Sequence, residues 1–239
     1  MRRALVTGGA SPIGAAVARR LAEDGVHVII HAHSGAARAA ALAAAIVAAG
    51  GSAETATFDL ADAAASTAAI EALLAAGPIQ ILVHNAGTHD DAPMAGMSAT
   101  QWHSVIDVSL NGFFHVAQPL LLPMIGTRWG RIVAMSSISA IMGNRGQANY
   151  AAAKAGLTGA VRSLSLECAP RGVTANVVAP GIIESPAITA VMSREQIAKL
   201  VPARRAGRPE EVAELVGFLA SDRAGYITGQ TISINGGLA

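Results

Sequence analysis

Three side chains in the second half of the chain have the types and spacing of an acid–base catalyst. Tyr150 and Lys154 are four positions apart in a segment of helical composition, so both project from one face of a helix. Ser137 ends an apolar run that predicts a strand. A phenol has an ordinary pKa of about 10, and a neighbouring ammonium group should lower it. We expect Tyr150 to protonate a carbonyl oxygen that Ser137 polarises while hydride adds to the carbon. The alternative is a packed tyrosine and a lysine with only its stem buried.

A second candidate site is the glycine-rich segment TGGASPIG (7–14), which follows the first apolar run. Such a turn brings the backbone close to a dinucleotide pyrophosphate at a helix N-terminus. Pro12 stands where a middle glycine is usual, but proline is well suited to the first position of a helix that Ser11 caps. The turn therefore predicts phosphate contacts from Thr7, Gly8, Ser11, Ile13 and Gly14.

Strand-like and helix-like segments alternate along the chain, which positions both candidate sites at the ends of strands. Almost continuously apolar runs predict strands at 3–7, 27–32, 55–59, 79–84, 130–137, 173–180 and 230–235. Helices are predicted at 13–24, 36–49, 62–76, 98–125, 150–169 and 209–221. The expected fold is α/β: one doubly wound, Rossmann-like domain over 1–239, with a seven-stranded parallel sheet and helices on both faces.

Composition excludes several classes of function. Of the 239 residues 52% are hydrophobic and 14% are charged, and the net charge of +1 provides no field for nucleic acid or an anionic membrane. The N-terminus lacks the long apolar core of a signal peptide, and the alanine-rich stretch 36–51 is too short to span a bilayer. A single cysteine, Cys168, suits a reducing cytoplasm. His84, His89, His103 and His115 show no metal-ligand spacing, so no metal is expected.

From Leu5 to Gly237 the chain resembles the short-chain dehydrogenase/reductase family, and within it the 3-oxoacyl-[acyl-carrier-protein] reductases of fatty-acid synthesis. The segments that carry the resemblance are TGGASPIG, FDLAD, HNAG, MGNRGQANYAAAKAG, RGVTANVVAPGIIES and GYITGQTISINGG. The resemblance implies catalytic roles for Ser137, Tyr150 and Lys154, the last two also touching the cofactor. It implies further cofactor contacts from Asp59, Leu60, Asn85, Ala86, Gly87, Pro180, Gly181 and Ile183, with Ser185 holding the nicotinamide carboxamide.

One departure from the family pattern concerns the fourth catalytic residue. That residue is usually an asparagine which kinks its helix and whose main-chain carbonyl holds a water of the proton relay. In VSLNGFF the position is Ser109, and we expect its carbonyl to serve in the same way. Asn111 is a poorer substitute, because a shift of two residues turns it to another face.

The second predicted strand ends without the acidic residue that binds the ribose hydroxyls of NAD. Ala32 stands there, while His33, Ser34 and Arg38 could receive a 2′-phosphate, so NADPH is the expected cofactor. The arginine that many NADPH reductases carry in the first loop is replaced by Ser11.

The resemblance also implies an acyl carrier protein as partner. Arg128 and Arg171 occupy the positions of arginines that dock this acidic protein, and segment 186–205 is the expected lid over the acyl chain. A homotetramer through 98–125, 150–169 and the last strand is expected. Other readings are a reductase of polyene or polyketide intermediates on a carrier, a reductase of a free ketone, or a non-catalytic NADP-binding subunit.

Overall fold

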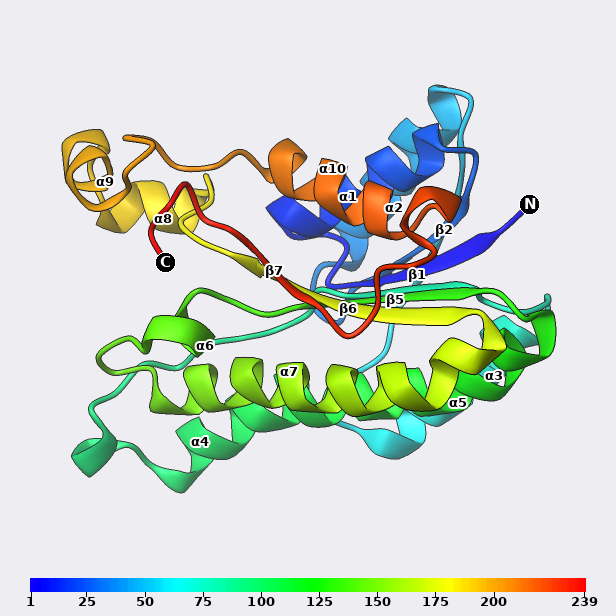
Figure 1. Ribbon diagram of the computed structural model, residues 1–239, viewed down its shortest axis with the longest axis horizontal. Coiled ribbons are helices and arrows are strands. Elements are labelled where there is room, and N and C mark those ends of the chain that lie inside the picture. Colours follow the sequence, from blue (N-terminus) through cyan, green and yellow to red (C-terminus); the bar gives the residue numbers. More distant parts are fainter.

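The computed structural model describes all 239 residues and has one seven-stranded sheet in the order β3-β2-β1-β4-β5-β6-β7, with every pair parallel (Figure 1). The strands are β1 (Arg3–Thr7), β2 (His27–His31), β3 (Ser52–Ala56), β4 (Ile81–His84), β5 (Gly130–Met135), β6 (Val173–Pro180) and β7 (Thr231–Ile234). The order reverses direction between β1 and β4, which is the ligand-binding position of such sheets. The predicted α/β fold is confirmed.

Ten helices and several shorter helical turns connect the strands. The α-helices are α1 (Pro12–Glu23), α2 (Ala36–Ala48), α3 (Ala63–Leu74), α4 (Ala99–Ile106), α5 (Gly112–Thr127), α6 (Ser139–Met142), α7 (Ala148–Cys168), α8 (Pro186–Val191), α9 (Arg194–Leu200) and α10 (Pro209–Leu219). The turns are η1 (Met94–Gly96), η2 (Asp107–Asn111, π-helical), η3 (Ala169–Arg171) and η4 (Asp222–Ala224).

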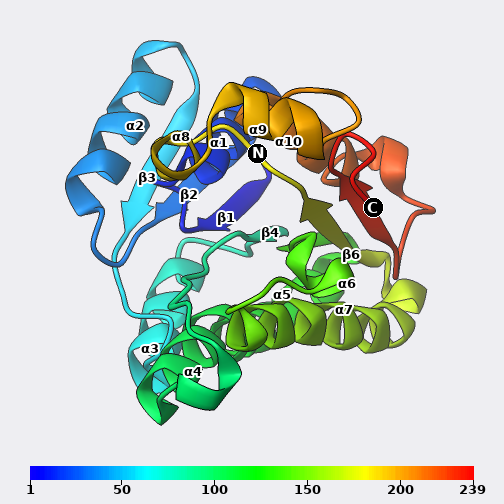
Figure 2. The same cartoon turned by 90° about the vertical axis from the view of Figure 1, so that its left-hand side faces the viewer.

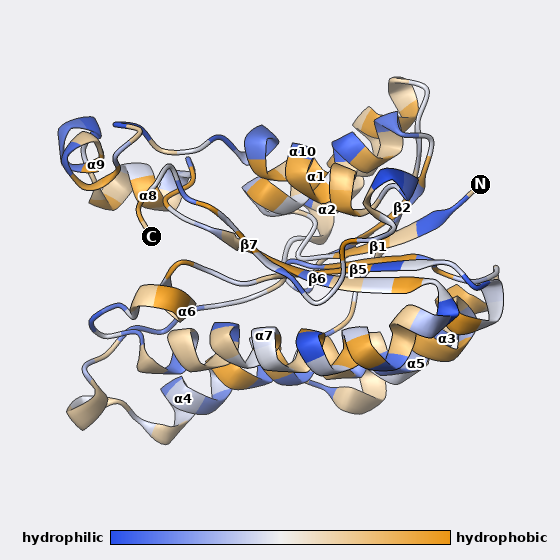
Figure 3. Cartoon of the chain, viewed as in Figure 1, coloured by the Kyte–Doolittle hydropathy of each residue, from blue (hydrophilic) through white to orange (hydrophobic).

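The sheet is covered on both faces, as its continuously apolar strands predict. Helices α1, α2 and α10 lie on one face, and α3, α4, α5 and α7 lie on the other (Figures 1 and 2). Successive strand residues serve opposite layers: Val28 and Ile30 belong to the first core, whereas Ile29 belongs to the second. The hydropathy colouring shows apolar segments along the strands and on the helices that flank them (Figure 3).

Two predicted elements differ from the observed ones. The predicted strand at 55–59 is β3 at Ser52–Ala56, because Phe58 leaves the sheet and packs its ring 4.2 Å from that of His31. The single helix predicted at 98–125 is divided at η2, a π-helical turn that contains Ser109. The helical stretch Ala99–Thr127 is long and apolar enough to cross a membrane by length and composition alone, but α4 and α5 pack against α7 and α3 in the second layer.

The predicted lid segment contains two short helices, α8 and α9. Ser193 caps α9 in a capping box with Gln196, and Ile197 and Val201 form a small apolar cluster with Ala206. This cluster is separate from the two main cores. The segment therefore has its own packing at the carboxyl edge of the sheet.

Candidate active site

The glycine-rich turn after β1 has the predicted capped geometry. The Ser11 hydroxyl accepts a hydrogen bond from the Gly14 amide at 3.2 Å, and Pro12 is the first residue of α1. The missing amide of Pro12 therefore breaks no bond of the helix. A Cβ on Gly14 would overlap the Gly8 carbonyl oxygen, which explains the need for glycine at this position.

Asn85, just after β4, holds this turn against the next strand. Its amide nitrogen donates to the carbonyl of Gly8 at 2.9 Å and to the Ser11 hydroxyl at 3.1 Å. Thr7 completes the junction, since its hydroxyl accepts from the backbone amides of Asn85 and Ala86. Thr7 is fully buried and lines neither of the two cavities described below, so it supports the turn from beneath.

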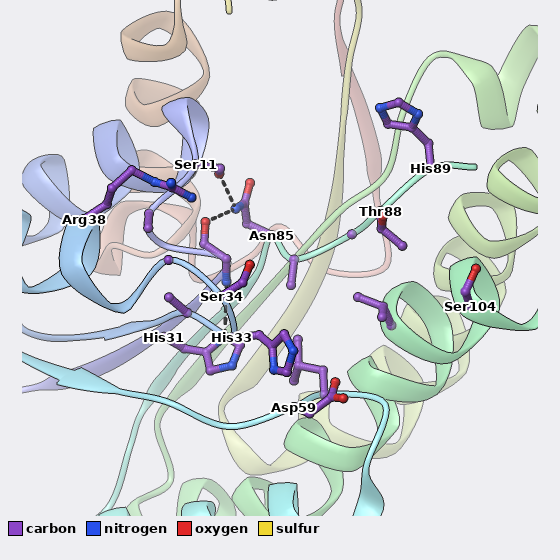
Figure 4. Close-up of a pocket in the computed structure, with 18 of the residues that line it drawn as sticks. Ser11, His31, His33, Ser34, Arg38, Asp59, Asn85, Thr88, His89 and Ser104 are labelled. Carbon is purple, nitrogen blue, oxygen red and sulfur yellow. Dashed lines mark hydrogen bonds between the residues drawn. The ribbon is translucent and has the colours of Figure 1, made fainter. Parts of the chain in front are cut away.

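A cavity of about 570 Å³ opens over the turn at the carboxyl ends of β1, β2 and β4 (Figure 4). It has the size and position expected for the adenosine half of a dinucleotide. Its lining includes the predicted cofactor residues Gly8, Ser11, His33, Ser34, Asp59, Leu60, Asn85, Ala86 and Gly87.

The end of β2 carries no carboxylate toward this cavity. His31 is buried, and its Nδ1 accepts the Gly8 amide at 3.3 Å while its Nε2 donates to the carbonyl of Phe58 at 3.0 Å. Ala32 follows, and the exposed Arg38 reaches the cavity from α2. The cavity wall there presents a guanidinium group where an acidic residue would select ribose hydroxyls.

A second cavity, at the ends of β5 and β6, contains three of the four predicted catalytic residues. It is lined by Ile13, Asn85, Met135, Ser136, Ser137, Tyr150, Lys154, Pro180, Gly181, Ile183 and Ile188. Asn85 lines both cavities, so the two cavities are neighbours. The structure thus brings Ser137 from the end of β5 together with Tyr150 and Lys154 from α7.

Lys154 is buried and held from two sides. Its Nζ donates to the Met135 carbonyl at 2.8 Å, and its own main-chain carbonyl accepts the Ser136 hydroxyl at 2.8 Å. The ammonium lies 5.8 Å from the centre of the Tyr150 ring. Burial lowers the pKa of Lys154 to about 8, so the group is mostly charged at neutral pH. Only one of its three N–H donors has an acceptor in the protein, which leaves donors for a bound diol.

The pKa of Tyr150 is shifted in the opposite direction from the sequence-based expectation. Burial raises the phenol's pKa, and the interaction with the Ser137 hydroxyl offsets only part of this effect. The expectation was wrong because it counted the lysine charge and omitted the burial of the phenol. A raised pKa keeps Tyr150 protonated at neutral pH, which is the form that a proton donor needs.

Asn149, which was not among the predicted site residues, fixes the start of the catalytic helix. Its side-chain nitrogen donates to the carbonyls of Asp90 and Gln101, each at 2.9 Å, and its oxygen accepts the Tyr150 amide at 2.8 Å. The residue is fully buried. A polar amide next to Tyr150 was the available signal, but its partners are distant in the sequence.

Ser109 is fully buried in η2. Its main-chain carbonyl accepts a hydrogen bond from His84 Nε2 at 3.0 Å, while its hydroxyl has no partner. His84 is a second residue of the site that the sequence did not predict, because its partner in η2 is 25 residues away. Asn111 is exposed and bonds to Asp107 at 2.7 Å, in agreement with the prediction that it turns away.

Other predicted site residues lie outside the two cavities. Gly14 is packed within the turn, and Ser185 caps α8 by accepting the Ile188 amide at 3.2 Å. Arg128 and Arg171 are exposed just before β5 and β6, whereas Ser137 and Tyr150 lie at the other ends of these strands. The eight residues of β6 separate the two edges by roughly 25 Å.

The two neighbouring cavities fit a nicotinamide dinucleotide in this structure. The turn leaves no room for a Cβ at Gly8, which would come 2.9 Å from the Ala86 Cα, so the backbone itself faces the first cavity. The buried Lys154 ammonium faces the second cavity with unused donors. Hydrogen-bond donors for phosphate and for a ribose diol are therefore present where a dinucleotide would place these groups.

Comparisons with known proteins agree with this geometry. A family model described as enoyl-(acyl carrier protein) reductase matches residues 8–239. The 3-oxoacyl-[acyl-carrier-protein] reductase of Escherichia coli (strain K12) is 42% identical, covering 98% of this chain and 96% of that protein. The corresponding reductase of Aggregatibacter actinomycetemcomitans is 39% identical, covering 98% of each. Nodulation protein G of Azospirillum brasilense is 41% identical, covering 98% and 97%. With its fold and its serine, tyrosine and lysine in one cavity, the chain belongs to the short-chain dehydrogenase/reductase family, whose members are oxidoreductases that use a nicotinamide cofactor.

Proposed function

We propose that this protein is an NADPH-dependent 3-oxoacyl-[acyl-carrier-protein] reductase of fatty-acid synthesis. It would reduce the 3-oxo group of a carrier-bound acyl thioester to a 3-hydroxy group. The observation that carries the proposal is the single cavity lined by Ser137, Tyr150 and Lys154, which lies beside the cavity that fits the adenosine half of a dinucleotide. The two 3-oxoacyl reductases among the relatives, similar over nearly the whole chain, support the choice of substrate.

The residues divide the chemistry in a simple way. A nicotinamide cofactor held by the two cavities would supply the hydride. Ser137 donates a hydrogen bond to the substrate carbonyl oxygen, and Tyr150 gives that oxygen its proton as negative charge develops. The pKa of Tyr150, raised by burial, keeps the phenol in the donating form. Lys154 contributes a positive charge that stabilises the phenolate left behind.

NADPH is supported by the polarity of the first cavity at the end of β2. Arg38, Ser34 and His33 line it, and Ala32 replaces the carboxylate that would bind ribose hydroxyls (Figure 4). A guanidinium group recognises phosphate through charge-assisted bonds.

The carrier protein and the tetramer are further parts of the proposal. Exposed apolar side chains on the outer helices, Phe114 and Leu122 on α5 and Leu166 on α7, support subunit contacts there. Arg128 and Arg171 face solvent at the edge of the sheet remote from Tyr150. A carrier protein docked on them would therefore serve the site of a neighbouring subunit. We place the enzyme in the cytoplasm, where acyl carrier proteins are found.

The proposal is tested by following reduced-nicotinamide absorbance with acetoacetyl-carrier protein and either NADPH or NADH. The chain has two tyrosines, which provide a matched pair of variants. Tyr150→Phe should lower kcat by about 10²- to 10⁴-fold and leave cofactor binding intact. Tyr226→Phe should have no effect, because Tyr226 is fully exposed.

A crotonyl-carrier substrate separates the proposal from enoyl reduction, the activity that the family model's description names. If NADPH is oxidised with crotonyl-carrier protein but not with acetoacetyl-carrier protein, the 3-oxoacyl assignment is refuted. Full activity of Tyr150→Phe would refute the proposed mechanism.

A further inference from the structure

The two hydroxyl groups that act on the carbonyl oxygen come from different elements and must be held in register. Ser137 follows β5, whereas Tyr150 lies in the first turn of α7. The hydroxyl of Ser137 accepts the backbone amide of Ser139 at 3.1 Å, so its own proton is left for another acceptor. The position of Ser137 therefore depends on what fixes the short turn 137–139.

Gln147, the residue before α7, bonds to this turn through its side chain. Its Oε1 accepts the Ser139 hydroxyl at 3.1 Å and the Asn144 side-chain amide at 2.9 Å. The side chain of Gln147 caps no backbone amide of α7. It joins the start of the helix that carries Tyr150 to α6, which begins at Ser139 and lies beside that part of α7 (Figure 1).

Asp91, in the loop after β4, determines which way the Gln147 amide points. Its carboxylate accepts a hydrogen bond from Gln147 Nε2 at 2.9 Å, and an ionised carboxylate has no proton to donate. The amide nitrogen must therefore face Asp91, which leaves Oε1 for Ser139 and Asn144. The other oxygen of Asp91 lies 3.5 Å from Nδ1 of the exposed His89.

We propose that Gln147 is a positioning residue for the catalytic serine: its amide, oriented by the Asp91 carboxylate, holds the turn 137–139 so that the Ser137 hydroxyl stays aligned with Tyr150. This inference rests on the proposed reductase function, in which both hydroxyls act on one oxygen. Gln147 and Asp91 line neither cavity, so their hydrogen bonds act on the site through the turn.

Single substitutions at the two positions should have different effects in the 3-oxoacyl assay. Gln147→Ala removes the link without changing the charge and should lower kcat about tenfold, with little change in the cofactor KM. Gln147→Glu should lower kcat at least as much, because two carboxylates then face each other. Asp91→Asn should keep kcat within about threefold of the wild type, since its side-chain oxygen can still accept Gln147 Nε2.

The double variant Asp91→Asn, Gln147→Glu exchanges donor and acceptor. The new amide at position 91 can donate to the new carboxylate at position 147, which still accepts from Ser139 and Asn144. Its kcat should therefore return to within about threefold of the wild type, so the two substitutions should not be additive. In Gln147→Glu alone, a protonated carboxyl can donate to Asp91. Its kcat relative to the wild type should therefore rise as pH falls from about 7 to 5.

Gln80→Glu is the matched control for an added charge at a half-buried glutamine. Gln80 Oε1 accepts the backbone amide of Arg3 at 3.0 Å at the other edge of the sheet, and kcat should not change. Charge alone is a separate explanation, because burial raises the pKa of Tyr150 and the charge of Asp91 raises it further. If charge alone matters, Gln147→Ala retains full kcat and Asp91→Asn does not, and this result would overturn the proposal.

A readout without substrate separates this proposal from the proposed function. The chain has two tyrosines, so cofactor-free protein labelled at the tyrosine Cζ gives two NMR signals, which Tyr226→Phe assigns. Gln147→Ala should shift the Tyr150 signal at pH 7, because the interaction of Tyr150 with the Ser137 hydroxyl changes. The signal of the exposed Tyr226 should stay in place.

Two results would overturn the proposal. One is a Tyr150 signal that does not move in folded Gln147→Ala protein, and the other is a double variant no more active than Gln147→Glu. If the wild-type protein does not reduce the carrier substrate but the Tyr150 signal moves as expected, the proposed function alone is refuted.

Discussion

The buried imidazole of His84 should make the stability of this protein depend on pH. Its ordinary pKa of 6.5 falls to about 3 in the folded protein, because burial disfavours the charged ring and Lys154 repels it. In the unfolded chain His84 is therefore protonated below about pH 6.5, whereas in the folded chain it is protonated only below about pH 3. The free energy of unfolding should decrease as pH falls through this window and be unaffected by His84 above it.

The size of the effect follows from the two pKa values. At pH 5 the unfolded ring is almost fully protonated and the folded ring almost fully neutral. Linkage then gives a loss of about 2 kcal/mol between pH 7 and pH 5 from this one group. His31 also has a pKa lowered by burial and adds a loss in the same direction. The wild-type slope alone therefore does not isolate His84.

His84→Gln provides the comparison, since a glutamine nitrogen can take the place of Nε2 and donate to the Ser109 carbonyl without titrating. Urea unfolding at pH 7, 6 and 5 gives the free energy of unfolding of both proteins. The variant should be less stable at pH 7, because its packing is imperfect. Its stability should nevertheless fall by about 2 kcal/mol less than that of the wild type between pH 7 and 5. If the free energies of unfolding of the two proteins change in parallel with pH, the assignment of a neutral, buried imidazole to His84 is refuted.

Three further predictions concern the site. Gly87→Ala should lower kcat and raise the cofactor KM, measured in the 3-oxoacyl assay, because its methyl group would come 2.9 Å from the Lys154 ammonium and displace it; unchanged kinetics would show that the position of the ammonium is not critical. Arg38→Ala should weaken NADPH binding about 10- to 100-fold and leave NADH binding unchanged in parallel fluorescence titrations, whereas equal losses would contradict a 2′-phosphate contact. Because the pKa of Lys154 is lowered to about 8, its positive charge is lost as pH rises through that value, so kcat/KM for the cofactor should decline above pH 8; a flat profile to pH 10 would show that the charge is not needed.

The sequence predicted the fold well because the strands are buried on both faces. Runs such as VHVII and PIQILVHN contain few polar residues, and this pattern places strands without reference to tertiary contacts. The error at 55–59 arose at the edge of the sheet, where β3 is only partly buried and its sequence, SAETA, lacks strong strand formers. Phe58, an aromatic residue of a type common in strands, shifted the predicted strand toward the C-terminus, but it packs against His31 beyond the end of β3.

The site was predicted where spacing along one element determines it. Tyr150 and Lys154 share a helix face whatever the rest of the fold does. The contacts of His84 and Asn149 join segments 25 to 77 residues apart, and no local pattern encodes such contacts. The sign of the Tyr150 pKa shift was beyond sequence reasoning for a related reason, because burial is a property of the assembled layers.

The two departures from the family pattern are accommodated by different means. Pro12 lacks a backbone amide at the first position of α1, where the amide of an α-helix is unpaired. No helix hydrogen bond is therefore lost, and Ser11 still caps α1. Ser109 removes a side-chain amide from a buried π-helical turn, which no backbone adjustment can replace. His84 Nε2 donates to the main-chain carbonyl of this turn, and the Ser109 hydroxyl is left buried without a partner. Pro12→Gly should therefore cost only helix stability, whereas Ser109→Ala should remove a buried hydroxyl that has no partner and should not destabilise the turn.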